Sequence, residues 1–180
     1  MSSCLRYQAY YSVDVLNGPG TRCVLFVSGC EHKCKGCYNA KTWRPDSGQY
    51  FTREIEDQIM RDLKDTRIRR SGLTLSGGDP LHPINVPYIA RLVERVKDEC
   101  PDKTIWCWTG YEMENLTQSQ RNIASRVDML IDGKFIESLK SPSLPWRGSS
   151  NQRLLTASTL ADYFAWHTAA PERQCILSVA

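Results

Sequence analysis

Three cysteines lie close together in the stretch VSGCEHKCKGCYNA, residues 27–40, at Cys30, Cys34 and Cys37. Thiolates that are this close in a chain usually share one partner. Cysteine is a ligand for zinc and for iron–sulfur clusters, and two cysteines can also form a disulfide. The stretch therefore predicts a metal or cluster site, unless the cysteines pair with each other.

The rest of the sequence argues against disulfides. The N-terminal residues MSSCLRYQAYYSVD contain no apolar segment of the kind found in secretory signals. Disulfides persist mainly in oxidising compartments, so we expect reduced thiols in a cytoplasmic chain. The other cysteines are scattered rather than arranged as a framework, and we expect Cys23 and Cys107 to be core thiols.

Composition excludes some classes of partner. A length of 180 residues suits one domain with its own core. The formal net charge of +3 is small for this length, so it indicates no nucleic-acid partner. No stretch approaches the roughly 20 apolar residues of a transmembrane helix, so we expect no membrane partner either.

Zinc is the first metal to consider, because His32 lies among the cysteines and would complete a Cys3His set. Structural zinc usually joins two ligand pairs separated by a longer loop, whereas all four candidates here fall within residues 30–37. We therefore favour His32 as a solvated loop histidine. A zinc-binding interaction module built on Cys30, His32, Cys34 and Cys37 stays the alternative from a different class.

A 4Fe–4S cluster usually takes four cysteines, and this stretch offers three. Three protein ligands leave one iron open for a substrate, in the way that catalytic zinc keeps one position free. The spacing Cys-x3-Cys-x2-Cys thus favours a cluster that takes part in chemistry.

The surrounding sequence alternates short apolar runs with segments of helical period. In residues 53–64, Ile55, Ile59 and Leu63 recur at every fourth position, and Thr52 precedes them as a candidate N-cap. The predicted strands are residues 23–27, 73–75, 104–108 and 129–131, and the predicted helices are residues 53–64, 86–98 and 113–126. This order predicts an α/β fold with a mainly parallel sheet. Since a full eightfold barrel needs about 250 residues, we expect a partial, open β/α barrel.

A distinctive loop follows each predicted strand. These loops are the cysteine stretch, SGGDPLHP (76–83), TGYE (109–112) and DGKF (132–135). Because the carboxyl ends of parallel strands meet at one edge of the sheet, the four loops are expected to form one site. Asp132 and Lys134 fit either a place in that site or a surface turn. Trp106 and Trp108 alternate on a strand, and we expect them to pack in the core.

The motif Cys-x3-Cys-x2-Cys-aromatic, which ends here at Tyr38, resembles that of the radical S-adenosylmethionine enzymes. Within that superfamily, several segments resemble the activating proteins of anaerobic ribonucleoside-triphosphate reductases. They are NGPGTRCVLFVSGC, CYNAKTWR, LSGGDPLHP, WTGY, DGKF and WRGSSNQR. The resemblance runs from about Tyr7 to Gln152.

The resemblance implies cofactors and residues that bind them. Cys30, Cys34 and Cys37 would ligate one 4Fe–4S cluster whose open iron binds S-adenosylmethionine. Contacts near the adenine would come from Gly36, Cys37 and Tyr38, and contacts at the methionine end from Gly77, Gly78 and Asp79.

The resemblance also implies a reaction and a partner. The reduced cluster would cleave S-adenosylmethionine to methionine and a 5′-deoxyadenosyl radical, which forms a glycyl radical on the catalytic subunit of the reductase. Reduced flavodoxin or a similar protein would supply the electron. The nearest alternative is the same chemistry on another glycyl-radical enzyme, such as pyruvate formate-lyase.

The C-terminal residues depart from the resemblance. We assign residues 1–153 to the radical S-adenosylmethionine domain and residues 154–180 to a C-terminal tail of uncertain order. An amphipathic helix from Ser158, ending before Pro171, is one alternative for this tail. We favour an appended or disordered segment.

Overall fold

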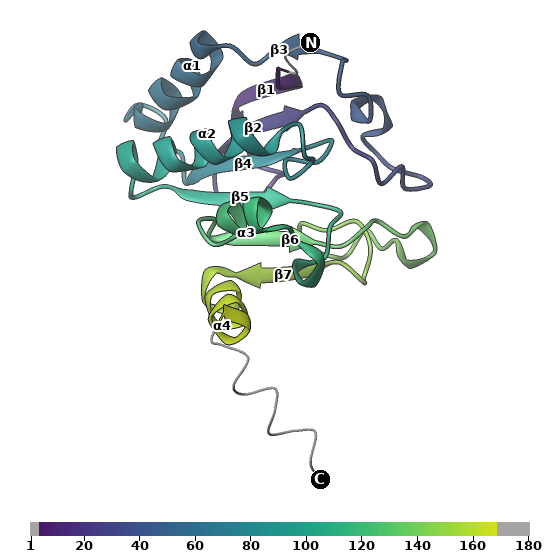
Figure 1. Cartoon of the computed structure of the whole chain (residues 1–180). Coiled ribbons are helices and arrows are strands. Elements are labelled where there is room, and N and C mark those ends of the chain that lie inside the picture. Colours follow the sequence, from purple (N-terminus) through teal and green to yellow (C-terminus); the bar gives the residue numbers. More distant parts are fainter. Residues whose placement is uncertain (1–3, 169–180) are drawn as a thin grey trace.

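In the computed structural model, which describes residues 4–168, one open sheet carries helices on one face (Figure 1). Its strands are β1 (Arg6–Asp14), β2 (Arg22–Val27), β3 (Gln49–Tyr50), β4 (Gly72–Gly77), β5 (Thr104–Trp108), β6 (Met129–Asp132) and β7 (Arg153–Thr156). Its helices are α1 (Arg53–Lys64), α2 (Val86–Glu99), α3 (Gln118–Ala124) and α4 (Ala157–Thr168). Short 3-10 turns occur at Ala40–Thr42, Met113–Asn115 and Glu137–Leu139.

The strand order is β3-β1-β2-β4-β5-β6-β7. Strands β2, β4, β5 and β6 are parallel neighbours, and α1, α2 and α3 form the crossovers between them. The predicted α/β class and the open, mainly parallel sheet are therefore confirmed. The sheet also has antiparallel additions that we did not predict, namely β1 and β3 at one edge and β7 at the other.

The two faces of the sheet differ in what covers them. Leu25, Leu75 and Ile105 point to the helices and form the main core with residues of α1 and α2. The opposite face has a buried arginine, Arg22, whose guanidinium lies 5.5 Å from the ring centre of Trp106. Trp106 is buried there, as expected for core packing. Trp108 is only half-buried and donates from Nε1 to the Trp146 carbonyl oxygen at 2.8 Å, so the same expectation is wrong for Trp108.

Helices α1 and α2 begin without a capping hydrogen bond from the side chain that precedes them. Helix α1 begins at Arg53 after Thr52, but the Thr52 side chain makes no capping hydrogen bond. Helix α2 follows Asn85, whose amide donates instead to the carbonyl oxygens of Ser28 and Asp79. The predicted helix over residues 113–126 is shorter, because Thr117 and Gln120 form a capping box that starts α3 at Gln118.

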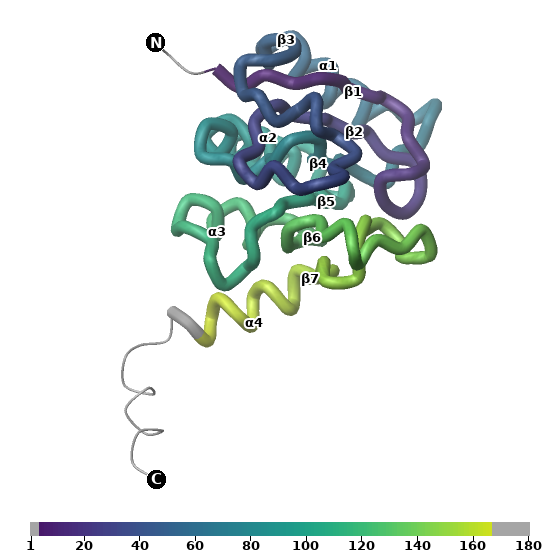
Figure 2. The backbone as a smooth tube through the Cα atoms, turned by 90° about the vertical axis from the view of Figure 1, so that its right-hand side faces the viewer, coloured from purple at the N-terminus to yellow at the C-terminus, as the bar shows by residue number. Residues whose placement is uncertain are grey.

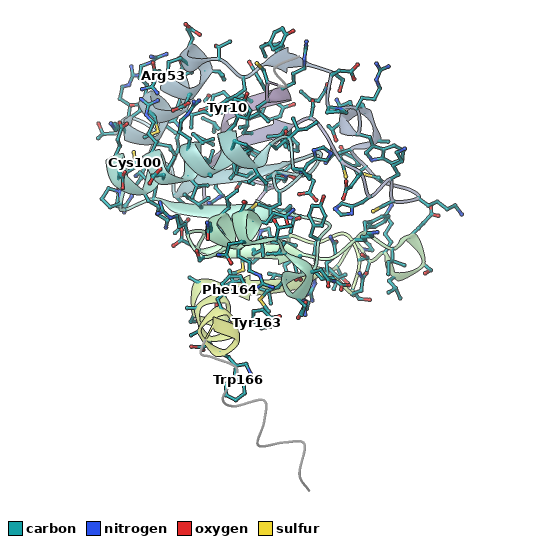
Figure 3. All side chains as sticks on the ribbon, viewed as in Figure 1. Tyr10, Arg53, Cys100, Tyr163, Phe164 and Trp166 are labelled. Atoms are coloured by element: carbon teal, nitrogen blue, oxygen red, sulfur yellow. The ribbon has the colours of Figure 1, made fainter. Side chains whose placement is uncertain are left out.

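The described part of the predicted tail is integrated into the fold. Strand β7 pairs with β6, and Leu155 and Leu160 are buried in the core. At the end of α4, Trp166 points away from the sheet (Figure 3). Residues 169–180, which include the predicted stop before Pro171, lie outside the described residues. Over residues 4–168, no helix has the length and apolar character that a membrane span needs.

Candidate functional site

The loops that follow β2, β4, β5 and β6 meet at the carboxyl edge of the parallel strands, and Figure 2 looks onto this edge. The N–H of Asp79 donates to the Gly29 carbonyl oxygen at 2.7 Å, which joins the first two loops. The N–H of Gly110 donates to the Asp79 carboxylate at 2.9 Å, and the N–H of Gly133 donates to the Tyr111 carbonyl oxygen at 3.0 Å. The expected convergence of the four loops is therefore confirmed.

The cysteine loop leaves β2 and bends sharply. Lys33 has a φ of 48° and Gly36 a φ of 72°, both in the left-handed region that favours glycine. The N–H of Cys37 donates to the Cys34 carbonyl oxygen at 3.1 Å, which closes a turn between the last two cysteines. These bends bring three free, partly buried thiols onto one short loop.

Backbone donors point at two of the sulfur atoms. Burial raises the pKa of the Cys30 thiol to about 11, while the N–H groups of His32 and Lys33 act in the opposite direction. Burial also raises the pKa of Cys34, and the N–H of Phe135 opposes it. Metal binding requires thiolates, so it must displace the protons of these thiols. N–H groups directed at sulfur are a feature of iron–sulfur sites, where they tune the cluster.

The described side chains do not form a ready site for a single metal ion. Zinc needs ligands about 2.0–2.3 Å from one common point. Across the described range 4–168, no three Cys, His, Asp or Glu side chains are grouped so that they could hold one metal ion. A cluster places each cysteine on a different iron, so its sulfur ligands stand farther apart.

His32 is buried, so the prediction of a solvated loop histidine is wrong. Its side chain is 5% exposed, and Nε2 lies 2.8 Å from Oδ2 of Asp79. The imidazole also packs edge-on against Tyr111, with ring centres 4.5 Å apart. The buried position follows from the convergence of the loops, which supplies a carboxylate partner far away in sequence. That convergence was the sequence signal that could have identified His32.

Asp79 is 1% exposed, and its carboxylate faces the protein. It accepts hydrogen bonds from the Thr109 hydroxyl at 2.9 and 3.0 Å and from the Leu81 N–H at 2.8 Å. With Gly110 and His32, this makes a set of four donors. The contact predicted between Asp79 and a cofactor stays a prediction, and the side chain has a structural role of its own.

The glycines of this site pack the loops against each other. A Cβ on Gly77, whose φ is 104°, would lie 2.7 Å from the backbone of Val27. A Cβ on Gly36 would lie 2.6 Å from Oε1 of Glu137, which also pairs with Lys35. Gly77 therefore needs glycine even without a ligand, because backbone atoms block a Cβ there. Gly36 favours glycine because of its φ of 72°, since the Glu137 side chain can move aside. The predicted cofactor contacts of both residues stay predictions.

Two hollows flank the cysteine loop. The first, of about 690 Å³, opens beside Cys34 and is lined further by His32, Tyr111, Lys134 and Phe135. The second, of about 680 Å³, runs along β1 and β2 and reaches Tyr38, whose side chain is 98% exposed. Both volumes lie in the range of sites for small ligands.

The segments DGKF (132–135) and WRGSSNQR (146–153) also lie at the site. Asp132 is buried and accepts hydrogen bonds from the Met113 N–H, at 2.9 Å, and from Arg153, so it is not a surface-turn residue. Lys134 is exposed at the first hollow. Its carbonyl oxygen accepts from Asn151 at 2.8 Å, which folds the WRGSSNQR segment back onto the loop after β6.

Comparison with known proteins gives a consistent result. The family described as "4Fe-4S single cluster domain" matches residues 16–155. The anaerobic ribonucleoside-triphosphate reductase-activating protein of Escherichia coli (strain K12) is 60% identical over 148 residues, which are 82% of this chain and 96% of that protein. The protein of the same name from Vibrio cholerae is 59% identical over 148 residues, with the same coverage. The protein of that name from enterobacteria phage T4 is 47% identical over 150 residues, or 83% of this chain and 93% of the phage protein.

Proposed function

Because this chain belongs to the family of anaerobic ribonucleoside-triphosphate reductase-activating proteins, we propose that Cys30, Cys34 and Cys37 hold its 4Fe–4S cluster. The protein is an activating oxidoreductase, and the catalytic subunit of the anaerobic reductase is its partner. The observation that carries the proposal is the set of three free thiols on one bent loop at the carboxyl edge of the sheet.

The chemistry that the bound group supplies is one-electron cleavage of S-adenosylmethionine, which gives methionine and a 5′-deoxyadenosyl radical that takes a hydrogen atom from a glycine of the partner. Cys30, Cys34 and Cys37 would hold three irons of the cluster, which would leave one iron without a protein ligand and free for S-adenosylmethionine. Burial raises the pKa of the Cys30 and Cys34 thiols, and the N–H groups near them stabilise thiolate charge and so partly offset that effect.

The loops beside the cysteines suit a ligand that binds partly through backbone groups. Gly36, Cys37 and Tyr38 lie on the cysteine loop, and we assign them to the adenine side of S-adenosylmethionine. We assign Gly77, Gly78 and Asp79 to the methionine side. Support for this comes from the packing of the two loops, since the N–H of Gly78 donates to the Val27 carbonyl oxygen at 2.8 Å.

The sheet suits a protein substrate. Strands β2, β4, β5 and β6 follow one another in order, with helices on one face, and we interpret them as a partial, open β/α barrel. The second hollow lies on the sheet face away from the helices, where the rings of Tyr11 and Phe26 meet. We infer that the partner's glycine reaches the cysteine loop from this open face. Reduced flavodoxin or a similar protein would supply the electron in an oxygen-poor cytoplasm.

The test is an anaerobic assay. The protein is reconstituted with iron and sulfide, reduced and mixed with S-adenosylmethionine, with and without the reductase subunit. We expect 5′-deoxyadenosine and methionine, and a glycyl radical in the electron paramagnetic resonance spectrum when the subunit is present. Cys34→Ala should abolish all three signals. The matched control is Cys23→Ala, which removes a buried core thiol and should keep the iron.

Two results would contradict the proposal. A colourless protein that binds zinc and no acid-labile sulfide would mean that the cysteine loop is a zinc site. A glycyl radical on pyruvate formate-lyase but none on the reductase subunit would mean that the partner is wrong.

A further inference from the structure

Side-chain contacts join the cysteine loop to the loops after β4 and β5, and the His32 side chain makes contacts with both of these loops. The Nε2 atom of His32 lies 2.8 Å from Asp79, on the loop after β4. The ring also covers Gly110 on the loop after β5, where a Cβ would come within 2.3 Å of the His32 ring. One side chain from the cysteine loop thus contacts both neighbouring loops.

The partner of His32 is itself firmly held. Asp79 is buried, and its carboxylate accepts from Leu81 and Gly110 backbone N–H groups and from the Thr109 hydroxyl. Its carbonyl oxygen accepts from the buried Asn85 amide at 2.8 Å. A carboxylate with this many fixed donors cannot move without breaking several hydrogen bonds, so it offers His32 a rigid support.

The backbone of the cysteine loop does not by itself specify one conformation, so contacts from side chains are needed to fix it. It contains glycines at residues 29 and 36 and a left-handed Lys33, so its own backbone preferences specify its path poorly. His32 lies between Cys30 and Cys34 in the chain, and its buried ring packs against Gly110 and Tyr111. Glu31 adds a second tie, since its carboxylate accepts from the Tyr111 hydroxyl at 2.7 Å.

We propose that His32 is a positioning residue, which fixes the segment between Cys30 and Cys34 against Asp79 and Gly110. This inference rests on the proposed function, because the fixed segment carries two of the cysteines that would hold the cluster. In this proposal the imidazole acts through its contacts with Asp79 and Gly110 and not as a metal ligand. Replacing a residue that supports the ligands of a metal typically lowers metal affinity or activity by roughly 10- to 100-fold.

The first test compares His32→Ala with His32→Gln, whose amide nitrogen can donate to Asp79 from nearly the same place. The control is Lys33→Ala, which changes an exposed side chain of the same loop. After reconstitution, we expect all variants to keep the wild-type content of iron and sulfide. His32→Ala should lower the affinity for S-adenosylmethionine by roughly tenfold and change the electron paramagnetic resonance spectrum of the reduced cluster with that ligand. His32→Gln should restore much of both.

Two results of this test would overturn the proposal. Wild-type affinity and an unchanged spectrum in His32→Ala would show that the loop needs no anchor. Loss of iron in both His32 variants would show that the imidazole is a ligand.

The second test needs no cluster, and uses Gly110. Gly110→Ala in the wild-type background places a methyl group against the His32 ring, whereas in His32→Ala the three nearest atoms to that methyl are gone. We expect Gly110→Ala to lower the thermal midpoint of the metal-free protein in the first background and to have little effect in the second. Equal effects in both backgrounds would contradict the contact on which the proposal depends.

A failure of the proposed function can be distinguished from a failure of the role proposed for His32. If the wild-type protein never cleaves S-adenosylmethionine, even with its partner, the proposed function fails and the Gly110 cycle still tests the packing of His32. If the wild-type protein is active and His32→Ala behaves like it in both tests, only the role of His32 fails.

Discussion

Gly78 lies directly against Gly29: a Cβ built on Gly78 would come within 2.5 Å of the Gly29 carbonyl oxygen. The N–H of Gly78 donates to Val27 and the N–H of Asp79 donates to Gly29, so hydrogen bonding continues beyond the ends of β2 and β4. The cysteine loop and the loop after β4 therefore touch through their backbones. The Gly-Gly pair sets the spacing of these loops before any cofactor binds.

Gly78→Ala should disturb the packing between the cysteine loop and the loop after β4. The added methyl group would meet backbone atoms of Gly29, which cannot rotate away as a flexible side chain would. We expect a loss of about 1–3 kcal/mol in the free energy of unfolding, the usual cost of overpacking, and a lower iron content after reconstitution. Urea denaturation of the metal-free protein measures the first effect and iron analysis the second. A variant with the wild-type midpoint would contradict the close contact.

Asn85 should be as important for the site as the residues that face the ligand. It is buried, and its amide donates to Ser28 at 2.9 Å and to Asp79 at 2.8 Å. Asn85→Ala removes the side-chain donor to the Ser28 carbonyl oxygen, whereas the Asp79 carbonyl oxygen still accepts from the His82 N–H at 3.0 Å. We therefore expect a cost of about 1–3 kcal/mol, for the one unsatisfied group at Ser28. Asn122→Ala, which truncates an exposed asparagine, should stay within about 0.5 kcal/mol of the wild type. Equal denaturation midpoints for the two variants would exclude this role for Asn85.

The parallel core of the fold could be predicted because its pattern is strong. The apolar run at residues 23–27 and the stripe of Ile55, Ile59 and Leu63 bury one continuous surface, and the structure has β2 and α1 at these places. The meeting of the loops followed from topology alone, since parallel strands end at one edge. The spacing of Cys30, Cys34 and Cys37 then predicted that this edge holds an iron–sulfur cluster.

The edges of the sheet could not be predicted for physical reasons. Strand β1 is half-exposed along most of its length, so its three tyrosines and its one valine show no clear alternation between a core face and a solvent face. Strand β7 is short, and its two leucines run directly into α4, which hides the boundary. The burial of His32 could not be predicted, because the local sequence shows only its neighbours along the chain and its partner Asp79 lies far away in sequence.

Arg22 should be irreplaceable by lysine. Its guanidinium donates to the Thr74 and Thr104 hydroxyls at 2.8 and 2.9 Å, and to the carbonyl oxygens of Leu73 and Thr104 at 2.9 Å each. Burial lowers the pKa of Arg22 to about 10, which still leaves it charged at neutral pH. The ammonium of Arg22→Lys cannot reproduce this planar set, so buried oxygens lose their donors.

We expect Arg22→Lys to lower the free energy of unfolding by roughly 1–3 kcal/mol at neutral pH. Arg44→Lys is the matched control, because Arg44 is an exposed arginine paired with Asp46, and its effect should be close to zero. The measurement is urea denaturation followed by tryptophan fluorescence, which also reports on Trp106 beside the guanidinium. A stability loss in Arg44→Lys as large as in Arg22→Lys would contradict the special position of Arg22.

Leu160 tests whether the chain after residue 153 belongs to the folded unit. It is fully buried in the core from α4, although the sequence alone favoured an appended tail here. Leu160→Ala removes a large part of a core side chain and should cost about 2–5 kcal/mol. Trp166 lies on the same helix and is 66% exposed, so Trp166→Ala should change the free energy of unfolding by less than about 0.5 kcal/mol. Because α4 follows the edge strand β7, which β4, β5 and β6 separate from β2 and its cysteine loop, the iron content of Leu160→Ala should stay near wild type while its thermal midpoint falls. If both variants melted with the wild type, α4 would not be part of the cooperative fold.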